Sequence, residues 1–270
     1  MIMKSYKEKF DIFICGGTQH VHLLLPLLRK LQPYGRVYLG SSFFSDRDLD
    51  QLSGLFDVLI EPRHSEDGYY NFELFCIRDI NRLATAPYFI KLDADVELQP
   101  NWIEYVEQCL EAHPDSVLFG PRGGNNRIDF VLSGELVRQV LKTEVYVSNA
   151  LKVGGGFYVG QTLFFKEQQS LMDIIHEFMW CFEDGVRIRP PINPEYWSKI
   201  FHQSREPIKL MGRSKNFQGD EDMLRSLVVH AAGAGERLHI IDSHERVRVI
   251  RTNILKPDAI AGLPAEAVIG

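Results

Sequence analysis

The chain has 270 residues, of which 45% are hydrophobic and 24% are charged, and its formal net charge is −6 at pH 7. These values are those of an ordinary globular protein, long enough for one large domain or for one domain with a small appendage. The acidic balance argues against a nucleic-acid-binding protein, because no excess of basic side chains is present to neutralise a phosphate backbone.

The cysteine pattern and the lengths of the apolar runs indicate the cellular compartment of the protein. Four cysteines are present without a Cys-x-x-Cys pair, at Cys15, Cys76, Cys109 and Cys181. This pattern favours buried free thiols in a reducing compartment over disulfides or a zinc site. The first ten residues lack the apolar core of a signal peptide, and no apolar run reaches the length of a transmembrane segment. We therefore expect a cytoplasmic protein.

The first part of the chain alternates predicted strands and helices. Hydrophobic periodicity predicts strands at 11–15, 36–39 and 57–60, and helices at 22–31, 46–55 and 71–84. Pro26 is expected in the first turn of its helix or at a kink. Such an alternation predicts a parallel sheet with helices on both faces, in which ligands bind beyond the carboxyl ends of the strands.

A glycine pair follows the first predicted strand. Gly16 and Gly17 are expected to end that strand in a turn. The backbone N–H groups of Cys15, Gly16 and Gly17 can approach a nucleotide closely there, because glycine has no Cβ. A plain strand-to-helix turn explains the pair equally well. No Gly-x-Gly-x-x-Gly motif is present, which disfavours a dinucleotide-binding fold.

The segment 86–102 carries the strongest chemical signal. Its residues 88–92 form a mostly apolar run between two prolines, which predicts a buried central strand. Asp93 and Asp95 follow it, and residues two apart in extended chain project to the same side. Neighbouring carboxylates repel each other unless a cation compensates, and Mg²⁺ or Mn²⁺ would also leave positions for phosphate oxygens. An acidic turn that caps the next helix is the alternative explanation.

The rest of the chain is less regular. Its glycine-rich and aromatic stretches predict loops at 120–126 and 190–207. Strands are expected at 116–119, 157–165, 237–241 and 246–250, and helices at 102–112, 135–142, 167–182 and 223–231.

Asp93-Ala94-Asp95, after an apolar strand and before 96–103, resembles the Asp-x-Asp motif of the GT-A glycosyltransferases, most closely of the family 2 type. The resemblance covers about 11–233. It implies an α/β chain with the GT-A fold, a mostly parallel central sheet and helices on both faces. We expect a single domain over 1–256, with a nucleotide-binding half at 1–98, an acceptor-binding half at 99–256 and a tail at 257–270.

The same resemblance implies an activity and its partners. The chain would transfer a sugar from a nucleoside-diphosphate sugar to a hydroxyl or amine of a small-molecule or glycan acceptor. Mn²⁺ or Mg²⁺ would be the cofactor. Asp93 would face the ribose or the metal, and Asp95 would face the metal.

Four further residues take roles from the resemblance. Arg78 would lie near the nucleotide, although an exposed helix arginine is an equal explanation. Glu221-Asp222 followed by Met223-Leu224 resembles the Glu-Asp-x-x-Leu motif, whose aspartate is the general base in inverting members. Asp222 is favoured over Glu221 for that role, while acids at a helix start also cap free N–H groups. His244 is the candidate that would complete the metal ligands, and an unused surface histidine is its alternative.

Two other functions stay open. The run 14–18 resembles the glycine-rich loop of sugar-1-phosphate nucleotidyltransferases, although Gln19 and His20 stand where an arginine is usual. Such an enzyme would release pyrophosphate, whereas a glycosyltransferase releases a nucleoside diphosphate. A non-catalytic protein that binds sugar nucleotides on the same fold is the third possibility, because a fold does not determine a function.

Overall fold

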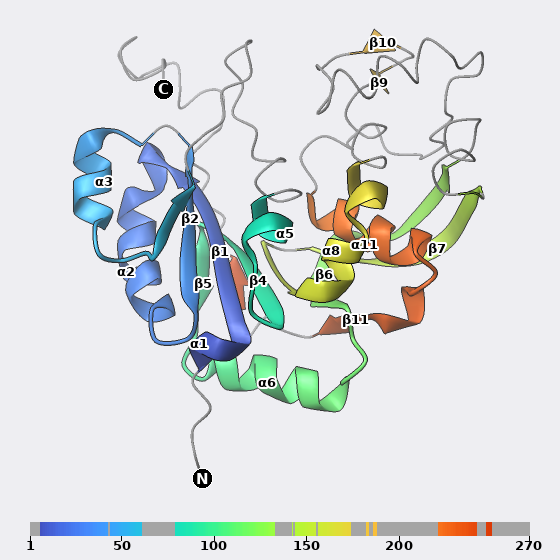
Figure 1. The fold of residues 1–270 in the computed structure, drawn as a ribbon, viewed down its shortest axis with the longest axis horizontal. Coiled ribbons are helices and arrows are strands. Elements are labelled where there is room, and N and C mark those ends of the chain that lie inside the picture. Colours follow the sequence, from blue (N-terminus) through green and yellow to red (C-terminus); the bar gives the residue numbers. More distant parts are fainter. Residues whose placement is uncertain are drawn as a thin grey trace.

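The computed structural model of the chain describes residues 6–42, 44–60, 79–132, 142, 144–154, 156–173, 182–183, 186–187, 221–241 and 247–249. These residues form an α/β fold on a mostly parallel, eight-stranded sheet (Figure 1). The strand order is β3-β2-β1-β4-β8-β6-β11, and β7 pairs with β6 beside this series. The predicted fold class, an α/β chain with a mostly parallel sheet, is confirmed.

The N-terminal part of the chain supplies the parallel half of the sheet. Its strands are β1 (Phe10–Gly17), β2 (Arg36–Ser42), β3 (Val58–Ile60) and β4 (Tyr88–Asp93). Its helices are α1 (Tyr6–Lys9), η1 (Thr18–His20), α2 (Val21–Leu31), α3 (Asp46–Leu52) and α5 (Ile80–Leu83). β1 pairs in parallel with both β2 and β4 and is buried along its whole length, as an apolar central strand must be.

The other half of the sheet is mixed. β8 (Phe157–Gln161) runs antiparallel to β4 and to β6 (Leu118–Leu132), and β6 also pairs with β7 (Val145–Val153) and β11 (Leu238–Ile241). Two small ladders join β5 (Val96–Leu98) to β12 (Val247–Val249), and β9 (Phe182–Glu183) to β10 (Val186–Arg187). The helices here are α6 (Trp102–Ala112), α8 (Thr162–Glu167), α11 (Glu221–Ala231) and η3 (Gly235–Arg237).

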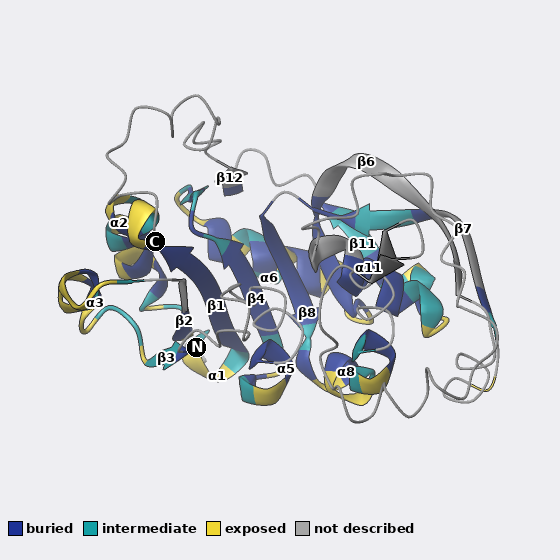
Figure 2. Ribbon diagram, turned by 90° about the horizontal axis from the view of Figure 1, so that it is seen from above, coloured by how far each residue is buried: buried dark blue, intermediate teal, exposed yellow. Residues whose placement is uncertain are grey.

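The two faces of the sheet have separate cores, because side chains alternate along a strand. On one face, side chains such as Ile12 and Ile90 pack against α2 and α6. On the other face, side chains such as Phe13 and Phe89 pack against α5, α8 and α11. Figure 2 shows β1, β4 and β8 as the buried centre between these layers. Among the described residues, none of the helices has both the length and the apolar character that crossing a membrane requires.

Several predicted elements are confirmed within a residue or two. They include the strand before the acidic pair, the helices at 22–31 and 102–112, and the helix that begins beside Glu221 and is followed by Gly233 with a φ of 73°. Cys15 and Cys109 are buried free thiols, as expected. Pro26 lies inside α2, beyond its first turn.

Other predictions were wrong. Residues 120–126 belong to β6 and not to a loop. Gly120 and Pro121 pair with β11, Arg122 pairs with Val153 of β7, and the register with β7 shifts before Arg127. Gly16 and Gly17 do not form a turn, since β1 continues through Gly17, which pairs with Ser42. The expected strand at 157–165 ends at Gln161 and α8 follows, and the expected helix at 46–55 ends at Leu52. The predictions for 71–78, 135–141, 174–180, 190–207 and 257–270 lie outside the described residues.

Candidate functional site

The acidic pair lies where the strands β1 and β4 end. These strands are parallel, and Cys15 is in register with Asp93. Their carboxyl ends therefore share one edge of the sheet, so that the turn after β4, which contains Asp95, lies near η1. This edge is where an α/β sheet binds its ligands. The structure thus brings together the glycine pair and the acidic pair that the sequence singles out.

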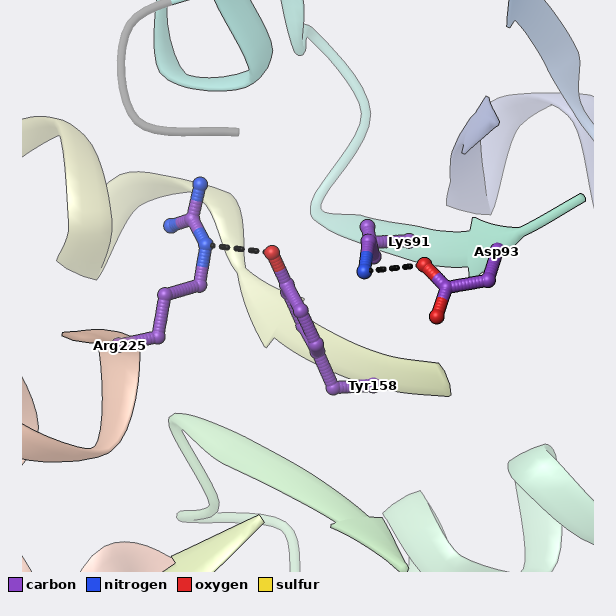
Figure 3. Close-up of polar contacts among 4 residues, drawn as sticks. All are labelled: Lys91, Asp93, Tyr158 and Arg225. Atoms are coloured by element: carbon purple, nitrogen blue, oxygen red, sulfur yellow. Dashed lines mark hydrogen bonds and ion pairs between the residues drawn. The ribbon is translucent and has the colours of Figure 1, made fainter. Parts of the chain in front are cut away.

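Asp93 is held from two sides. Its Oδ1 accepts a bond of 2.6 Å from Nζ of Lys91, whose side chain is fully buried (Figure 3). Its backbone N–H donates to the carbonyl of Gly156 at 2.8 Å. Gly156 has a φ of 74°, and a Cβ there would lie 2.7 Å from Oδ2 of Asp93. The carboxylate keeps 36% of its side-chain surface exposed, so it is fixed in orientation and still accessible.

Asp95 completes the pair and is half-buried. Burial raises the pKa of its carboxyl group above the ordinary value, and the negative charge of Asp93 raises this pKa further. Both influences disfavour the ionised form, and a bound cation would relieve them. Two carboxylates with hard oxygen atoms fit Mg²⁺ or Mn²⁺, which coordinate oxygen.

His20 is a neighbour of this pair that the sequence analysis did not select. Its Nδ1 accepts a hydrogen bond of 3.3 Å from the backbone N–H of Gly17. Burial lowers the pKa of His20, and the nearby charge of Asp95 acts in the opposite direction. With Nδ1 accepting, the proton of a neutral ring is on Nε2, which makes His20 a hydrogen-bond donor at this edge. In the sequence, the only indication that His20 belongs to the site is its position just after the end of a predicted strand.

The glycine pair has a structural use as well. A Cβ at Gly16 would lie 2.9 Å from Cδ1 of Leu24 and 3.2 Å from Cβ of Ala94. Gly16 therefore lets the acidic turn pack closely against β1 and α2. Beyond Gly17, Oγ1 of Thr18 donates to Oδ2 of Asp48 at 2.8 Å, which ties η1 to the start of α3.

A buried polar network extends from the site into the core. The Lys91 ammonium lies 5.5 Å from the ring centre of Tyr158, whose hydroxyl accepts from Nε of Arg225 at 3.0 Å (Figure 3). The guanidinium of Arg225 lies 4.6 Å from the ring centres of both Phe89 and Phe165. Its Nη1 also donates to Oδ1 of Asn81 at 3.2 Å. Sequence reasoning missed this network because it depends on contacts between β4, β8, α5 and α11.

The other predicted site residues are not placed as fully. Arg78 and His244 lie outside the described residues. Glu221 and Asp222 begin α11, and the structure describes their backbone but not their side chains. In the part of the chain that the structure describes, no group of three or more His, Cys, Asp or Glu side chains is arranged to hold a metal ion. Asp93 and Asp95 thus remain a two-carboxylate site there.

No protein-family model matches the chain, and no curated protein sequence matches it. Among solved structures, it is similar to galactosyltransferase LgtC in complex with donor and acceptor sugar analogues, with 10% identity and a TM-score of 0.44 over 87% of this chain and 74% of that chain. Mouse xyloside xylosyltransferase 1 is similar with 11% identity and a TM-score of 0.41, over 87% and 86% of the two chains. TarS from S. aureus, in complex with UDP-GlcNAc, gives 11% identity and 0.38 over 59% and 47%. These likenesses are distant.

Proposed function

We propose that this protein is a metal-dependent glycosyltransferase with a GT-A fold, which transfers a sugar from a nucleoside-diphosphate sugar to an acceptor hydroxyl or amine. One observation carries this proposal: an accessible pair of carboxylates lies beside a glycine-containing strand end, at the ligand-binding edge of an α/β sheet. The orientation of Asp93 by Lys91 and Gly156 supports it further.

In this proposal Asp93 and Asp95 hold Mn²⁺ or Mg²⁺ through their carboxylate oxygens. The cation would supply the positive charge that stabilises the departing diphosphate. His20 donates from Nε2 to an oxygen at the same edge, and the backbone at Cys15, Gly16 and Gly17 lies beside the nucleotide.

The remaining roles stay with the residues that the family motif indicates. Arg78 assists at the diphosphate, and His244 adds a metal ligand. Asp222, or Glu221 in its place, takes the proton from the acceptor hydroxyl. The donor would be bound by the half at 1–98 and the acceptor by the half at 99–256, in a cytoplasmic protein.

A thermal-shift screen of nucleoside diphosphates, with and without Mn²⁺, tests the proposal, because a ligand that binds only the folded state raises the melting temperature. We expect a nucleotide that stabilises the protein only when Mn²⁺ is present. Asp95→Asn should lower its affinity at least about 100-fold in calorimetry, since a charged metal ligand is lost. Asp50→Asn, which changes an exposed carboxylate on α3, is the matched control.

Unchanged nucleotide affinity in Asp95→Asn would contradict the metal assignment. Product analysis then separates the activities. Release of a nucleoside diphosphate from a nucleotide sugar supports transfer, whereas release of pyrophosphate from a triphosphate and a sugar phosphate indicates a nucleotidyltransferase. Nucleotide binding with neither product indicates a binding protein.

A further inference from the structure

A buried positive charge adjoins the acidic pair. Lys91 lies in the middle of the central strand β4, its side chain has no exposed surface, and its Nζ is 2.6 Å from Oδ1 of Asp93. A buried lysine is uncommon because removing an ammonium ion from water is costly unless a partner compensates. Here that partner is a proposed metal ligand. Lys91 and a bound cation would therefore act on the same carboxylate.

The position of this charge is restricted. Lys91 is in register with Tyr158 on the neighbouring strand β8, and its ammonium lies 5.5 Å from the centre of that ring. The Tyr158 hydroxyl is in turn bonded to Arg225, which is 1% exposed and packed against two phenylalanine rings. Figure 3 shows Tyr158 between Arg225 and Lys91. The side chain of Lys91 is therefore enclosed beside Asp93.

We propose that Lys91 makes the site selective for a divalent cation that is bound to a diphosphate, and weakens its binding of the free cation. This inference rests on the proposed function. The two carboxylates carry two negative charges and Lys91 offsets one of them, so a free cation meets a less negative site. Once the cation is bound, these groups together are positive, which favours an incoming diphosphate. Without Lys91, the carboxylates and the cation would be neutral together.

Manganese binding without any turnover tests this inference. The affinity for Mn²⁺ is measured by electron paramagnetic resonance, alone and with a saturating nucleoside diphosphate found in the screen above. In the unmodified protein we expect Mn²⁺ to bind at least about tenfold more tightly with the nucleotide than alone. Equal affinities would overturn the inference without the need for any variant.

Lys91→Met removes the charge with an apolar side chain of similar length, which suits a buried position. It should bind free Mn²⁺ at least about tenfold more tightly than the unmodified protein, and the effect of the nucleotide should shrink. Lys91→Gln, which keeps a hydrogen-bond donor toward Asp93, should behave in the same way. A role of Lys91 in packing alone predicts unchanged or weaker binding of free Mn²⁺ in both variants, and that result would overturn the inference.

Lys9→Met is the matched control. It removes a lysine that forms a bond of 2.8 Å with Glu107, next to the opposite end of β1 from the acidic pair, and should leave Mn²⁺ affinity unchanged. The two proposals fail in different ways. If the unmodified protein binds no nucleotide with Mn²⁺, the proposed function fails. If it does, but free Mn²⁺ binds no more tightly after the loss of Lys91, only this inference fails.

Discussion

The two faces of the central strand differ in chemistry. Ile90 and Leu92 of β4 point to the layer of α2 and α6, where they are fully buried among apolar side chains. Phe89, Lys91 and Asp93 alternate with them and belong to the opposite face, toward α5, α8 and α11. One face is thus an ordinary hydrophobic core, while the other combines aromatic rings with buried charges.

This difference indicates that the two faces have different roles, one in stability and the other in ligand binding. Apolar packing stabilises the sheet in proportion to the area removed from water, and it is indifferent to charge. The polar face contributes less to stability, because removing a charge from water costs free energy that a partner must offset. Its network runs from Arg225 through Tyr158 toward Lys91 and the acidic pair. We therefore expect variants of the polar face to alter ligand binding, and variants of the apolar face to alter stability alone.

The largest effect is expected for Arg225→Ala on the polar face. The change leaves a cavity beside the Phe89 and Phe165 rings and removes a hydrogen-bond donor from Tyr158 and from Asn81. The loss of a buried, hydrogen-bonded cation should lower the free energy of unfolding by at least about 3 kcal/mol. Urea denaturation measures this loss. Mn²⁺-dependent nucleotide affinity of the folded protein should also fall several-fold. Tyr158, which packs against Lys91, loses the hydrogen bond from Arg225 that fixes its position.

Leu28→Ala makes the matching change on the apolar face. Leu28 lies in α2 and is fully buried, so its truncation should cost about 2–5 kcal/mol. We expect no change in Mn²⁺-dependent nucleotide affinity for the folded fraction. A binding defect in Leu28→Ala equal to that of Arg225→Ala would remove the distinction between the two faces.

Gly156→Ala is expected to reduce stability less than the two changes above, and to reduce ligand binding through a contact with Asp93. The φ of 74° disfavours alanine by about 1–2 kcal/mol. The new Cβ would also collide with Oδ2 of Asp93, so Mn²⁺-dependent nucleotide affinity should fall at least about tenfold by calorimetry. Gly54→Ala is the control, because Gly54 has the same φ of 74° and nothing within 4 Å of its Cβ position. If both variants bind the nucleotide equally well, Gly156 has no part in placing Asp93.

The smallest effect is expected for Ser45→Ala at the start of α3. Ser45 accepts from the backbone N–H of Asp48 and donates to its carboxylate at 2.8 Å. Its loss should cost about 1 kcal/mol at neutral pH. Burial acts to raise the pKa of Asp48, but hydrogen bonds from Ser45 and Thr18 outweigh it and hold this pKa below its ordinary value.

The pH dependence of that variant has a definite sign. A depressed folded pKa means that ionised Asp48 stabilises the fold above its ordinary pKa, and that this stabilisation is lost as the pH falls through the folded value. The difference between Ser45→Ala and the unmodified protein should therefore shrink in acid, as urea denaturation at a series of pH values would show. A difference that grows in acid would contradict the role assigned to Asp48.

Much of the parallel half of the sheet follows from local patterns. The apolar run before Asp93 and the amphipathic pattern of α2 are properties of short segments, and both were predicted correctly. Residues 120–126 were not, because glycine and asparagine favour loops locally, whereas pairing with β11 and β7, which are distant in sequence or follow later, makes them part of a strand. The tertiary partner outweighed the local preference.

For the candidate site, the sequence predicts the chemical groups but not what holds them. The spacing of Asp93 and Asp95 indicates a pair of acids, and parallel strands bring this pair beside Gly16 and Gly17 at the end of β1. Neither the burial of Lys91 nor the close approach of Gly156 can be predicted in the same way, since both depend on β8, more than sixty residues later in the chain. His20 was missed for a different reason: its position just after a strand end is a weak signal, although the backbone group that aligns its ring belongs to Gly17, three residues earlier.

The ladder between β5 and β12 has a consequence for the order of assembly. β5 begins directly after Asp95, and Val96 at its start pairs with Val249. Closing so long a stretch of chain is slow, because the entropy of the intervening residues is lost before the contact forms. During synthesis, the parallel strands can associate before Val249 has been made, whereas the ladder between β5 and β12 cannot form until then. We therefore expect β5, directly after the acids, to be paired later than β4, which carries Asp93.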